Sequence, residues 1–374
     1  MNKITLITGS LPPIKCGVGF YSQKLLENFY DKGIKDIEVI STIGTNRTPY
    51  GIKTVRDWKI RSLSNIIKII KSTRPNTVHI QYPAVGYKRE LGINFLPYLI
   101  RLLLPSSKLI LTLHEYHESR TIGKLRNIIT SLPVHAIIVS NDKDKDSLPG
   151  ILRKKTVIIP IGSNIKKIDL VPGEDLLKNN LDKLGLKNFK KTLLFFGFSS
   201  PNKRLESIIE ILKSENMKDF QILLLTELNQ DNIYHKKLIN IFNNFNIGDK
   251  RIAWTGYLPD DQVSKILQRG QYFILPQSRP LSAKSGTAIA AITHNLIMIS
   301  SGGDIVTNKP FQNNINSLLV WPPNAKNFSS AIVGAEQNKV LSSKIKIGAD
   351  ELSKYFSWDH ITQMHEMIYE IDKI

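Results

Sequence analysis

The sequence predicts an α/β protein of two doubly wound domains, each a parallel sheet covered by helices on both faces. Three observations predict this class. The chain has 374 residues, about twice the length of an ordinary domain. Hydrophobic residues make up 41% of it, which is enough for two large cores. Short apolar runs alternate with segments of helical periodicity, and this alternation stops near residue 160 and then starts again.

The first half contains five short runs rich in β-branched residues or leucine. They predict buried strands at Ile4–Thr8, Ile37–Thr42, Thr77–Gln81, Leu109–Leu113 and Ala136–Ser140. Between the strands, apolar residues recur at helical spacing, as they do from Leu63 to Ile70. Nearly continuous apolar strands separated by helices indicate a parallel sheet that is buried on both faces.

A polar stretch rich in Asn and Lys, residues 162–191, separates the two halves, and we place the domain boundary at its start, between residues 165 and 166. The second half again alternates, with predicted helices such as Leu205–Leu212, Asp261–Leu267 and Ser329–Glu336. Its predicted strands are Thr192–Phe196, Gln221–Thr226, Arg251–Trp254, Tyr272–Leu275, Leu296–Ser300 and Leu318–Trp321. Two such domains in tandem predict a cleft between the carboxyl ends of the two sheets, where ligands of these folds bind.

The net charge of +19 is concentrated in the first half of the chain. Residues 1–170 contain 27 basic and 12 acidic residues, which leaves an excess of only +4 for the rest. A basic half indicates an anionic partner, such as a membrane or a lipid-linked diphosphate, and lysine-rich faces that merely keep the protein in solution are the alternative. Residues 53–126 include 14 basic and 4 acidic residues, so we expect a membrane-facing patch there. No nucleic-acid-binding motif accompanies the charge, and we expect no nucleic-acid partner.

Other sequence features predict a cytoplasmic protein that can attach peripherally to the inner face of the plasma membrane. Cys16 is the single cysteine and cannot form an intrachain disulfide. No Cys/His cluster has zinc-ligand spacing, so we expect no metal site. The apolar stretch Ile93–Leu104 is interrupted by Pro97 and is too short to span a bilayer, and the N-terminal segment is too short for a signal peptide.

Two glycines follow the first predicted strand, at the turn into a helix expected to begin near Gly19. Gly17 and Gly19 allow a phosphate or sugar to approach the helix N-terminus closely. Their spacing does not match the dinucleotide-binding fingerprint. An ordinary turn is the alternative interpretation of this glycine pair.

Polar side chains also follow two neighbouring strands of the first domain. His114 and Glu115 end the fourth predicted strand, and Gln81 and Tyr82 end the third. Because carboxyl ends of parallel strands share one sheet edge, these residues predict one candidate surface. A histidine held for structural reasons is the alternative for His114.

In the second domain, Lys203 and Arg204 are predicted to lie in the first turn of a helix. Cations there oppose the helix dipole unless an anion is bound, so the pair predicts a phosphate site. A later loop, Ser282–Thr287, offers hydroxyl groups and Lys284 ahead of a small-residue helix expected to begin near Gly286. Lys284, Ser285 and Thr287 with the free N–H groups predict a diphosphate cradle, and an ordinary Ser285 N-cap is the alternative.

Taken in order, these segments resemble the retaining GT-B glycosyltransferases of family 4, and the resemblance runs from end to end. The segments that carry it are Leu11-Pro-Pro, Cys16-Gly-Val-Gly-Phe-Tyr, His114, Val157-Ile-Ile-Pro-Ile-Gly-Ser-Asn, Phe196-Gly, Lys203, Thr255-Gly-Tyr-Leu-Pro-Asp and Tyr355-Phe-Ser-Trp-Asp-His-Ile. The resemblance implies an acceptor-binding domain over 1–165 and a nucleotide-sugar-binding domain over 166–356. It also implies a closing helix, about 357–374, that crosses back onto the first domain.

The resemblance further implies a retaining, metal-independent transfer of sugar from a nucleotide donor to a glycan or lipid-linked acceptor, as in surface polysaccharide synthesis. No cofactor is implied beyond this co-substrate, whose nucleotide stays open. His114 and Lys203 are the implied catalytic residues, with acceptor contacts at Gln81, Tyr82 and Glu115. The implied donor contacts are Gly17, Gly19, Lys203, Arg204, Tyr257, Ser282, Lys284, Ser285, Gly286 and Thr287.

The sequence departs from the family pattern at three positions. Phe198 stands where an arginine is usual, and Ser282 and Ala290 stand where two glutamates are usual, the second of which grips the ribose. A family variant with a Ser-x-Arg/Lys-x-Gly-Ser/Thr loop resembles Ser282–Thr287. A catalytically silent, glycosyltransferase-like subunit that binds a nucleotide or a partner is therefore the alternative function.

Overall fold

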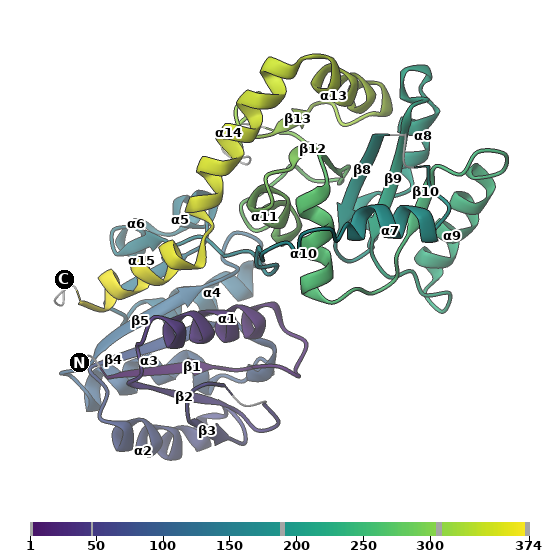
Figure 1. Ribbon diagram of the computed structural model, residues 1–374. Helices are drawn as coiled ribbons and strands as arrows, with labels where there is room; N and C mark the ends of the chain where they lie inside the picture. Colours follow the sequence, from purple (N-terminus) through teal and green to yellow (C-terminus); the bar gives the residue numbers. More distant parts are fainter. Residues whose placement is uncertain (1–2, 46–47, 188–190, 304–308, 371–374) are drawn as a thin grey trace. The chain divides into compact units, whose positions relative to one another are not determined.

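The computed structural model describes residues 3–45, 48–187, 191–303 and 309–370 (Figure 1). The chain divides into two compact units, one of Met1–Gly162 with Trp358–Ile374 and one of Ser163–Ser357. Each unit is a parallel sheet with helices on its faces, which confirms the predicted class of two Rossmann-like α/β domains. The last four residues of the expected closing helix, 371–374, lie outside the described residues.

The first unit contains a seven-stranded sheet of order β3-β2-β1-β4-β5-β6-β7, and all neighbouring strands are parallel. Its strands are β1 Ile4–Thr8, β2 Ile37–Thr42, β3 Ile52–Val55, β4 Thr77–Tyr82, β5 Lys108–Leu113, β6 Ala136–Val139 and β7 Thr156–Ile158. The five predicted strands are present. The two additional strands, β3 and β7, are the short edges of the sheet, where partial exposure weakens the apolar signal.

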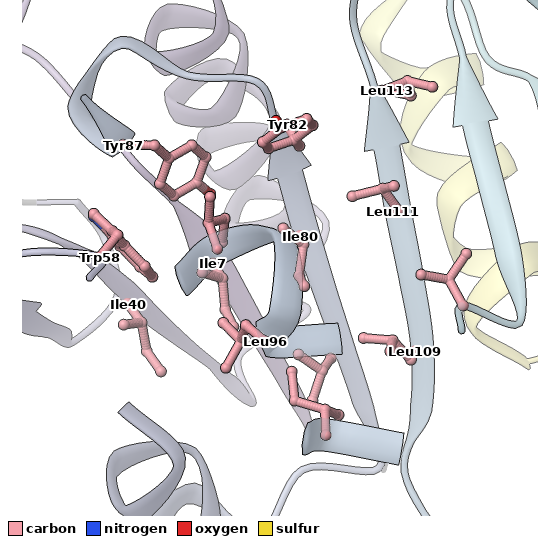
Figure 2. Packing of buried hydrophobic residues seen from close by; sticks show 14 of the residues in the cluster. Ile7, Ile40, Trp58, Ile80, Tyr82, Tyr87, Leu96, Leu109, Leu111 and Leu113 are labelled. Atoms are coloured by element: carbon pink, nitrogen blue, oxygen red, sulfur yellow. The ribbon is translucent and has the colours of Figure 1, made fainter. Parts of the chain in front are cut away.

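Helices cover both faces of this sheet and create two cores. The helices are α1 Gly17–Asp31, α2 Leu63–Thr73, α3 Gly92–Leu103, α4 Thr121–Ser131, α5 Asp142–Ser147, α6 Gly150–Arg153 and α15 Trp358–Glu370, with 3-10 turns η1 Ile60–Ser62 and η2 Val85–Tyr87. On one face, Leu96 of α3 and the ring of Trp58 pack with strand residues such as Ile7 and Ile80 (Figure 2). On the other face, α1 and α15 pack together over the sheet.

Helix α1 begins two residues earlier than expected, at Gly17, and its second glycine has a packing role. A Cβ atom on Gly19 would lie 2.9 Å from the carbonyl oxygen of Ser10, closer than real Cβ contacts allow. The glycine therefore lets α1 lie directly on the loop that follows β1. Around Gly17 no such contact exists within 4 Å, so space remains open at the helix N-terminus.

The second unit contains a six-stranded parallel sheet of order β10-β9-β8-β11-β12-β13. Its strands are β8 Lys191–Phe196, β9 Phe220–Leu225, β10 Ile252–Trp254, β11 Tyr272–Leu275, β12 Ile297–Ser301 and β13 Leu318–Val320. Its helices are α7 Leu176–Lys183, α8 Ser207–Lys213, α9 Ile233–Phe245, α10 Asp260–Arg269, α11 Gly286–Thr293, α13 Ala325–Gln337 and α14 Lys339–Tyr355, with 3-10 turns η3 Pro201–Lys203 and η4 Glu215–Met217. All six predicted strands are present, and the described part of the polar stretch 162–191 includes the helix α7. Within residues 3–370, leaving aside the gaps named above, no helix combines the length and hydropathy that crossing a bilayer requires.

Buried histidines join α15 to the first sheet. His79 Nδ1 lies 2.8 Å from the Tyr369 hydroxyl, and His79 Nε2 lies 2.7 Å from Thr112 Oγ1. His365 bonds through Nδ1 to the carbonyl of Ile361, whereas its buried Nε2 has no partner among the described residues. Burial lowers the pKa of His365 from 6.5 to about 4 and that of His79 well below 6.5. Both rings are therefore neutral at pH 7.

We expect acid to destabilise the protein through these rings. A histidine whose pKa is lower in the folded state binds protons more readily in the unfolded state. Protonation therefore does not reduce the stability of the folded state above about pH 6.5, and it reduces this stability progressively as the pH falls toward about 4. For His365 the loss is roughly 3 kcal/mol. Urea titrations across this range should show a steep fall in the free energy of unfolding. His365→Leu should flatten that fall, and an unchanged slope in the variant would show that His365 does not titrate there.

Candidate functional site

The strand order of each sheet identifies where a ligand site is expected. In a doubly wound sheet the loops diverge where the strand order reverses, and this leaves a crevice at the carboxyl ends of two adjacent strands. In the first sheet the reversal lies between β1 and β4, and in the second between β8 and β11. Apart from Tyr257, which follows the edge strand β10, the candidate residues from the sequence lie in or directly after these strands or their immediate neighbours.

In the second unit, the loop after β8 lies against the N-terminus of α11. Gly197 has φ 123°, and a Cβ atom on it would lie 2.6 Å from Thr287 Oγ1. The loop after β11 joins the same cluster, because Ser278 N–H donates to the carbonyl of Asn202 over 2.9 Å. Two loops distant in sequence are therefore brought together at the switch point by direct contacts.

The structure corrects the prediction for Lys203 and Arg204. They do not lie in the first turn of an α-helix, since Lys203 ends the 3-10 turn Pro201–Lys203 and Arg204 is left-handed, with φ 49°. The helix α8 begins only at Ser207. The expectation based on the dipole of this helix is therefore wrong, because the tight turn and the left-handed residue delay the start of the helix.

Lys203 nevertheless has the properties of an anion ligand. Its side chain is half-buried, and desolvation lowers the pKa of its ammonium group below 10.5. Within the described part of the chain, no carboxylate forms an ion pair with it. A partly desolvated cation without a counter-ion gains free energy when an anion binds beside it.

The loop before α11 is organised mainly by its own hydroxyl groups. Ser285 is the N-cap, and its Oγ accepts from Ala288 N–H over 3.4 Å, as the alternative interpretation predicts. Ser282 Oγ accepts from the N–H of Lys284 over 3.3 Å. The Ser282 and Ser285 hydroxyl groups accept hydrogen bonds from the loop and keep their own O–H groups as donors. The N–H groups of Gly286 and Thr287, which lack intrahelical acceptors, are further donors for an anion.

Two exposed aromatic rings lie on loops that follow strands of the second sheet, at the carboxyl ends of these strands. Tyr257 follows the edge strand β10 after Gly256, whose φ is 80°, and 77% of its surface is exposed. Phe198, at the position where the family resemblance implies an arginine, is 94% exposed. Arg204 is half-buried. Among the described residues, no hydrogen bond or ion pair links Tyr257 or Arg204 to Gly197 or Thr287.

His235 and Ser199 also lie near this site, although the sequence did not predict them. His235, in the first turn of α9, accepts from Asn229 N–H at Nδ1 and donates from Nε2 to the Ser199 carbonyl over 3.1 Å. These partners fix one neutral tautomer. Ser199 Oγ is buried and has no partner among the described residues. The Gly197-x-Ser199 spacing after an apolar strand was the available signal, and the contact with His235 arises only in the fold.

In the first unit, His114 directly follows β5 and is held from two sides. Its backbone N–H donates to the Tyr82 carbonyl, and the Nε2 atom of its ring lies 2.8 Å from Gln81 Oε1. Because an amide oxygen only accepts, His114 carries a proton on Nε2. The ring also meets Tyr21 of α1 edge-on, with centroids 5.2 Å apart. His114 is therefore a half-buried, oriented imidazole beside the switch point of the first sheet.

The remaining first-unit candidates differ in accessibility. Gln81 is fully buried, with its Oε1 against His114 and its amide 3.3 Å from His79. Tyr82 points to the opposite face of the sheet and is buried in the core, where its hydroxyl accepts from Asn94 (Figure 2). These placements leave no room for direct acceptor contact by either side chain. Glu115 is exposed.

We expect Gly197→Ala to weaken nucleoside diphosphate binding by about tenfold or more. The new Cβ would collide with Thr287 Oγ1 and push the β8 loop away from α11, and it would also strain a backbone conformation that favours glycine. Gly173→Ala is the matched control, because Gly173 has φ 82° but nothing within 4 Å of its Cβ position. Equal affinities for the two variants in calorimetric titrations would show that the Gly197–Thr287 contact does not shape the site.

Comparison with solved structures places this fold among GT-B glycosyltransferases. A glycosyltransferase from Rickettsia africae is 17% identical, with a TM-score of 0.77 over 98% of this chain and 97% of its own. HepE from Anabaena in complex with UDP and glucose is 14% identical, with a TM-score of 0.71 over 99% and 100%. WaaG, a glycosyltransferase of lipopolysaccharide biosynthesis, is 12% identical, with a TM-score of 0.61 over 98% and 99%.

Sequence comparison adds nothing to this, since the chain matches no protein-family model and no curated protein. Another structural neighbour, from Listeria monocytogenes, is assigned as a UDP-N-acetylglucosamine 2-epimerase, with 12% identity and a TM-score of 0.61 over 99% and 97%. The same two-unit fold thus serves more than one reaction of nucleotide sugars. What the comparisons show for this chain is the GT-B fold.

Proposed function

We propose that the protein transfers a sugar from a nucleotide-sugar donor to a glycan or lipid-linked acceptor. The observation that carries this proposal is Lys203, a half-buried ammonium group with lowered pKa and no ion-pair partner among the described residues, at the switch point of the second sheet. Structural neighbours crystallised with UDP and with UDP-glucose support a nucleotide-sugar ligand for a fold of this kind.

In this proposal the second unit binds the donor diphosphate. Lys203 and the N–H groups of Gly286 and Thr287 stabilise the negative charge that grows as the bond between the sugar C1 and the phosphate oxygen breaks. The acceptor oxygen forms the new bond to C1, and its proton passes to the departing phosphate oxygen. Retention of configuration and independence from metal are part of the proposal and follow from the family resemblance.

The first unit binds the acceptor in the same proposal. His114 is the proposed catalytic residue of this unit, and Gln81 is a positioning residue that holds its ring in place beside β5. The exposed carboxylate of Glu115 is available for hydroxyl groups of a glycan. Surface polysaccharide synthesis is the biological setting that we propose.

A nucleotide-binding subunit without turnover is the second candidate, and the α11 helix favours it. The side chain of Ala290, where the family resemblance implies a ribose-binding glutamate, is fully buried in the core. Carboxylate recognition of ribose from this position is therefore absent.

Nucleotide binding and turnover separate the two candidates. In a thermal-shift screen of uridine, guanosine, adenosine and cytidine diphosphates, we expect one to raise the melting temperature by mass action. The matching nucleotide sugar should then release nucleoside diphosphate when a glycan or lipid-linked acceptor is added. Binding without acceptor-dependent release would support the silent subunit, and no binding of any nucleotide would refute both candidates.

A further inference from the structure

Helices α3 and α4 lie side by side on one face of the first sheet. They pack against each other, and the Tyr98 hydroxyl of α3 donates to the carbonyl of Ile129 in α4 over 2.9 Å. Arg126 of α4 also reaches Asn94 Oδ1 of α3 over 2.8 Å. The two helices therefore form one continuous outer surface of the first unit.

The side of α3 that faces away from the sheet is mostly apolar. Ile93, Leu96 and Ile100 already fill the core beneath the helix. Nevertheless, the outward positions carry Phe95 and Leu102, and Leu102 is 74% exposed. The exposed Arg101 is the one charged residue of this helix. A helix face that carries so many exposed apolar side chains is ordinarily covered.

Helix α4 continues this apolar surface. Ile122 is 77% exposed, and Leu125 and Leu132 follow it at helical spacing. We call the exposed apolar side chains of the two helices and their ends the outer stripe. It consists of Leu91, Phe95, Tyr98, Leu102, Leu103, Ile122, Leu125 and Leu132.

The neighbouring helix α2 lacks such an exposed apolar face, although it covers the same side of the sheet. Helix α2 packs beside α3 and buries Ile66 and Ile70 toward the same core. Its outward residues include Lys68, Lys71 and Ser72, which is the usual polar face of a surface helix. The outer stripe is thus confined to α3 and α4.

The charge around the outer stripe is net positive. Neither α3 nor α4 contains an acidic residue. The loops that lead into them expose Lys88, Arg89 and Arg120, together with Glu115 and Glu118. A second copy of the chain is a poor occupant, because two copies, each with a net charge of +19, would bring like-charged surfaces together. An apolar stripe with cations at its borders complements an anionic lipid surface.

We propose that the outer stripe docks on an anionic lipid bilayer, with its apolar side chains in the acyl boundary and the cations Lys88, Arg89 and Arg120 at the headgroups. Phe95 and Tyr98 suit this position, since aromatic rings are favoured at the membrane interface. This goes beyond the basic patch expected from the sequence, because it assigns the binding to apolar insertion by two particular helices. It does not depend on the proposed sugar transfer.

Vesicle flotation with the full chain tests this proposal. The parent protein should float with vesicles of phosphatidylcholine containing about one third phosphatidylglycerol and should stay with the soluble fraction when the vesicles are pure phosphatidylcholine. The double variant Leu102→Gln, Ile122→Gln should lower the partition coefficient on anionic vesicles by about tenfold or more. Raising the salt concentration should weaken parent binding as the cations are screened.

The matched control is Ile233→Gln, Ile247→Gln, which removes two equally exposed isoleucines from the second unit and should bind as the parent does. Melting temperatures of all variants verify folding. Equal flotation of the stripe variant and the parent would overturn the proposal, as would binding that is indifferent to lipid charge. A parent that is a dimer in light scattering and becomes monomeric in the stripe variant would also overturn it, in favour of a second copy as occupant.

Discussion

Replacing Lys203 by alanine is expected to weaken nucleoside diphosphate binding by about tenfold or more. The ammonium group is half-buried and lacks an ion-pair partner among the described residues, so a bound diphosphate would be its counter-ion. Loss of a hydrogen bond to a charged group costs about 1.5 to 3 kcal/mol. The folded state should not suffer, because removing a partly desolvated cation relieves an unfavourable burial.

Calorimetric titration with the nucleoside diphosphate found by thermal shift measures the effect. Lys178→Ala is the control, since Lys178 is an exposed lysine on α7 of the same unit. Lys203→Arg preserves the charge and should retain much of the affinity. Because burial lowers the pKa of this lysine below 10.5, parent affinity should begin to fall at a pH below 10.5 as the lysine loses its charge, whereas the arginine variant keeps its charge. Parent-like binding by a folded Lys203→Ala protein would remove Lys203 from the donor site.

Gly86→Ala is expected to have the largest effect on stability. The new Cβ would lie 1.5 Å from the Gly9 carbonyl oxygen, in a place where the 3-10 turn η2 touches the loop after β1. The backbone N–H of Gly86 also donates to Ser10 Oγ over 2.8 Å, so moving the turn away from the loop would break this hydrogen bond. Overlap with backbone cannot be relieved by rotating a side chain, so we expect a loss above about 3 kcal/mol.

Thermal unfolding of matched variants measures this loss. Gly334→Ala in the middle of α13 is the control, because nothing lies within 4 Å of its Cβ position. It should be neutral or stabilising, since alanine favours the helix over glycine. If the Gly86→Ala and Gly334→Ala proteins had the same melting temperature, the loop after β1 and the turn η2 could move apart without loss of stability.

The buried strands follow from local sequence. The expected bounds of the strands at Ile4–Thr8, Ile37–Thr42 and Tyr272–Leu275 agree with the structure residue for residue. A strand buried on both faces must be apolar throughout, so the sequence carries its signal directly. The edge strand Ile52–Val55 is half-exposed and contains Lys53, and a short strand of this kind resembles a loop in sequence.

The candidate site divides in the same way. Ser285 as an N-cap and Gly286 as the start of α11 are local features, and the sequence determines them. The delayed start of the helix after Lys203, the contact of Gly197 with Thr287 and the burial of Tyr82 depend on residues far away in the chain. Propensity and periodicity cannot report such contacts, because they exist only after the sheet brings separate loops together.

By itself, the sequence determined two parallel α/β domains, the identity of most strands and the loops that we propose as the site. Only the tertiary structure decided which of those loop residues are accessible. It turned Gln81 inward to orient His114, left Lys203 half-buried without an ion-pair partner among the described residues, and set α3 and α4 side by side with apolar outer faces. The physical reason is that apolar patterning fixes which residues are buried within an element, whereas the partners of a polar group depend on how elements distant in sequence pack.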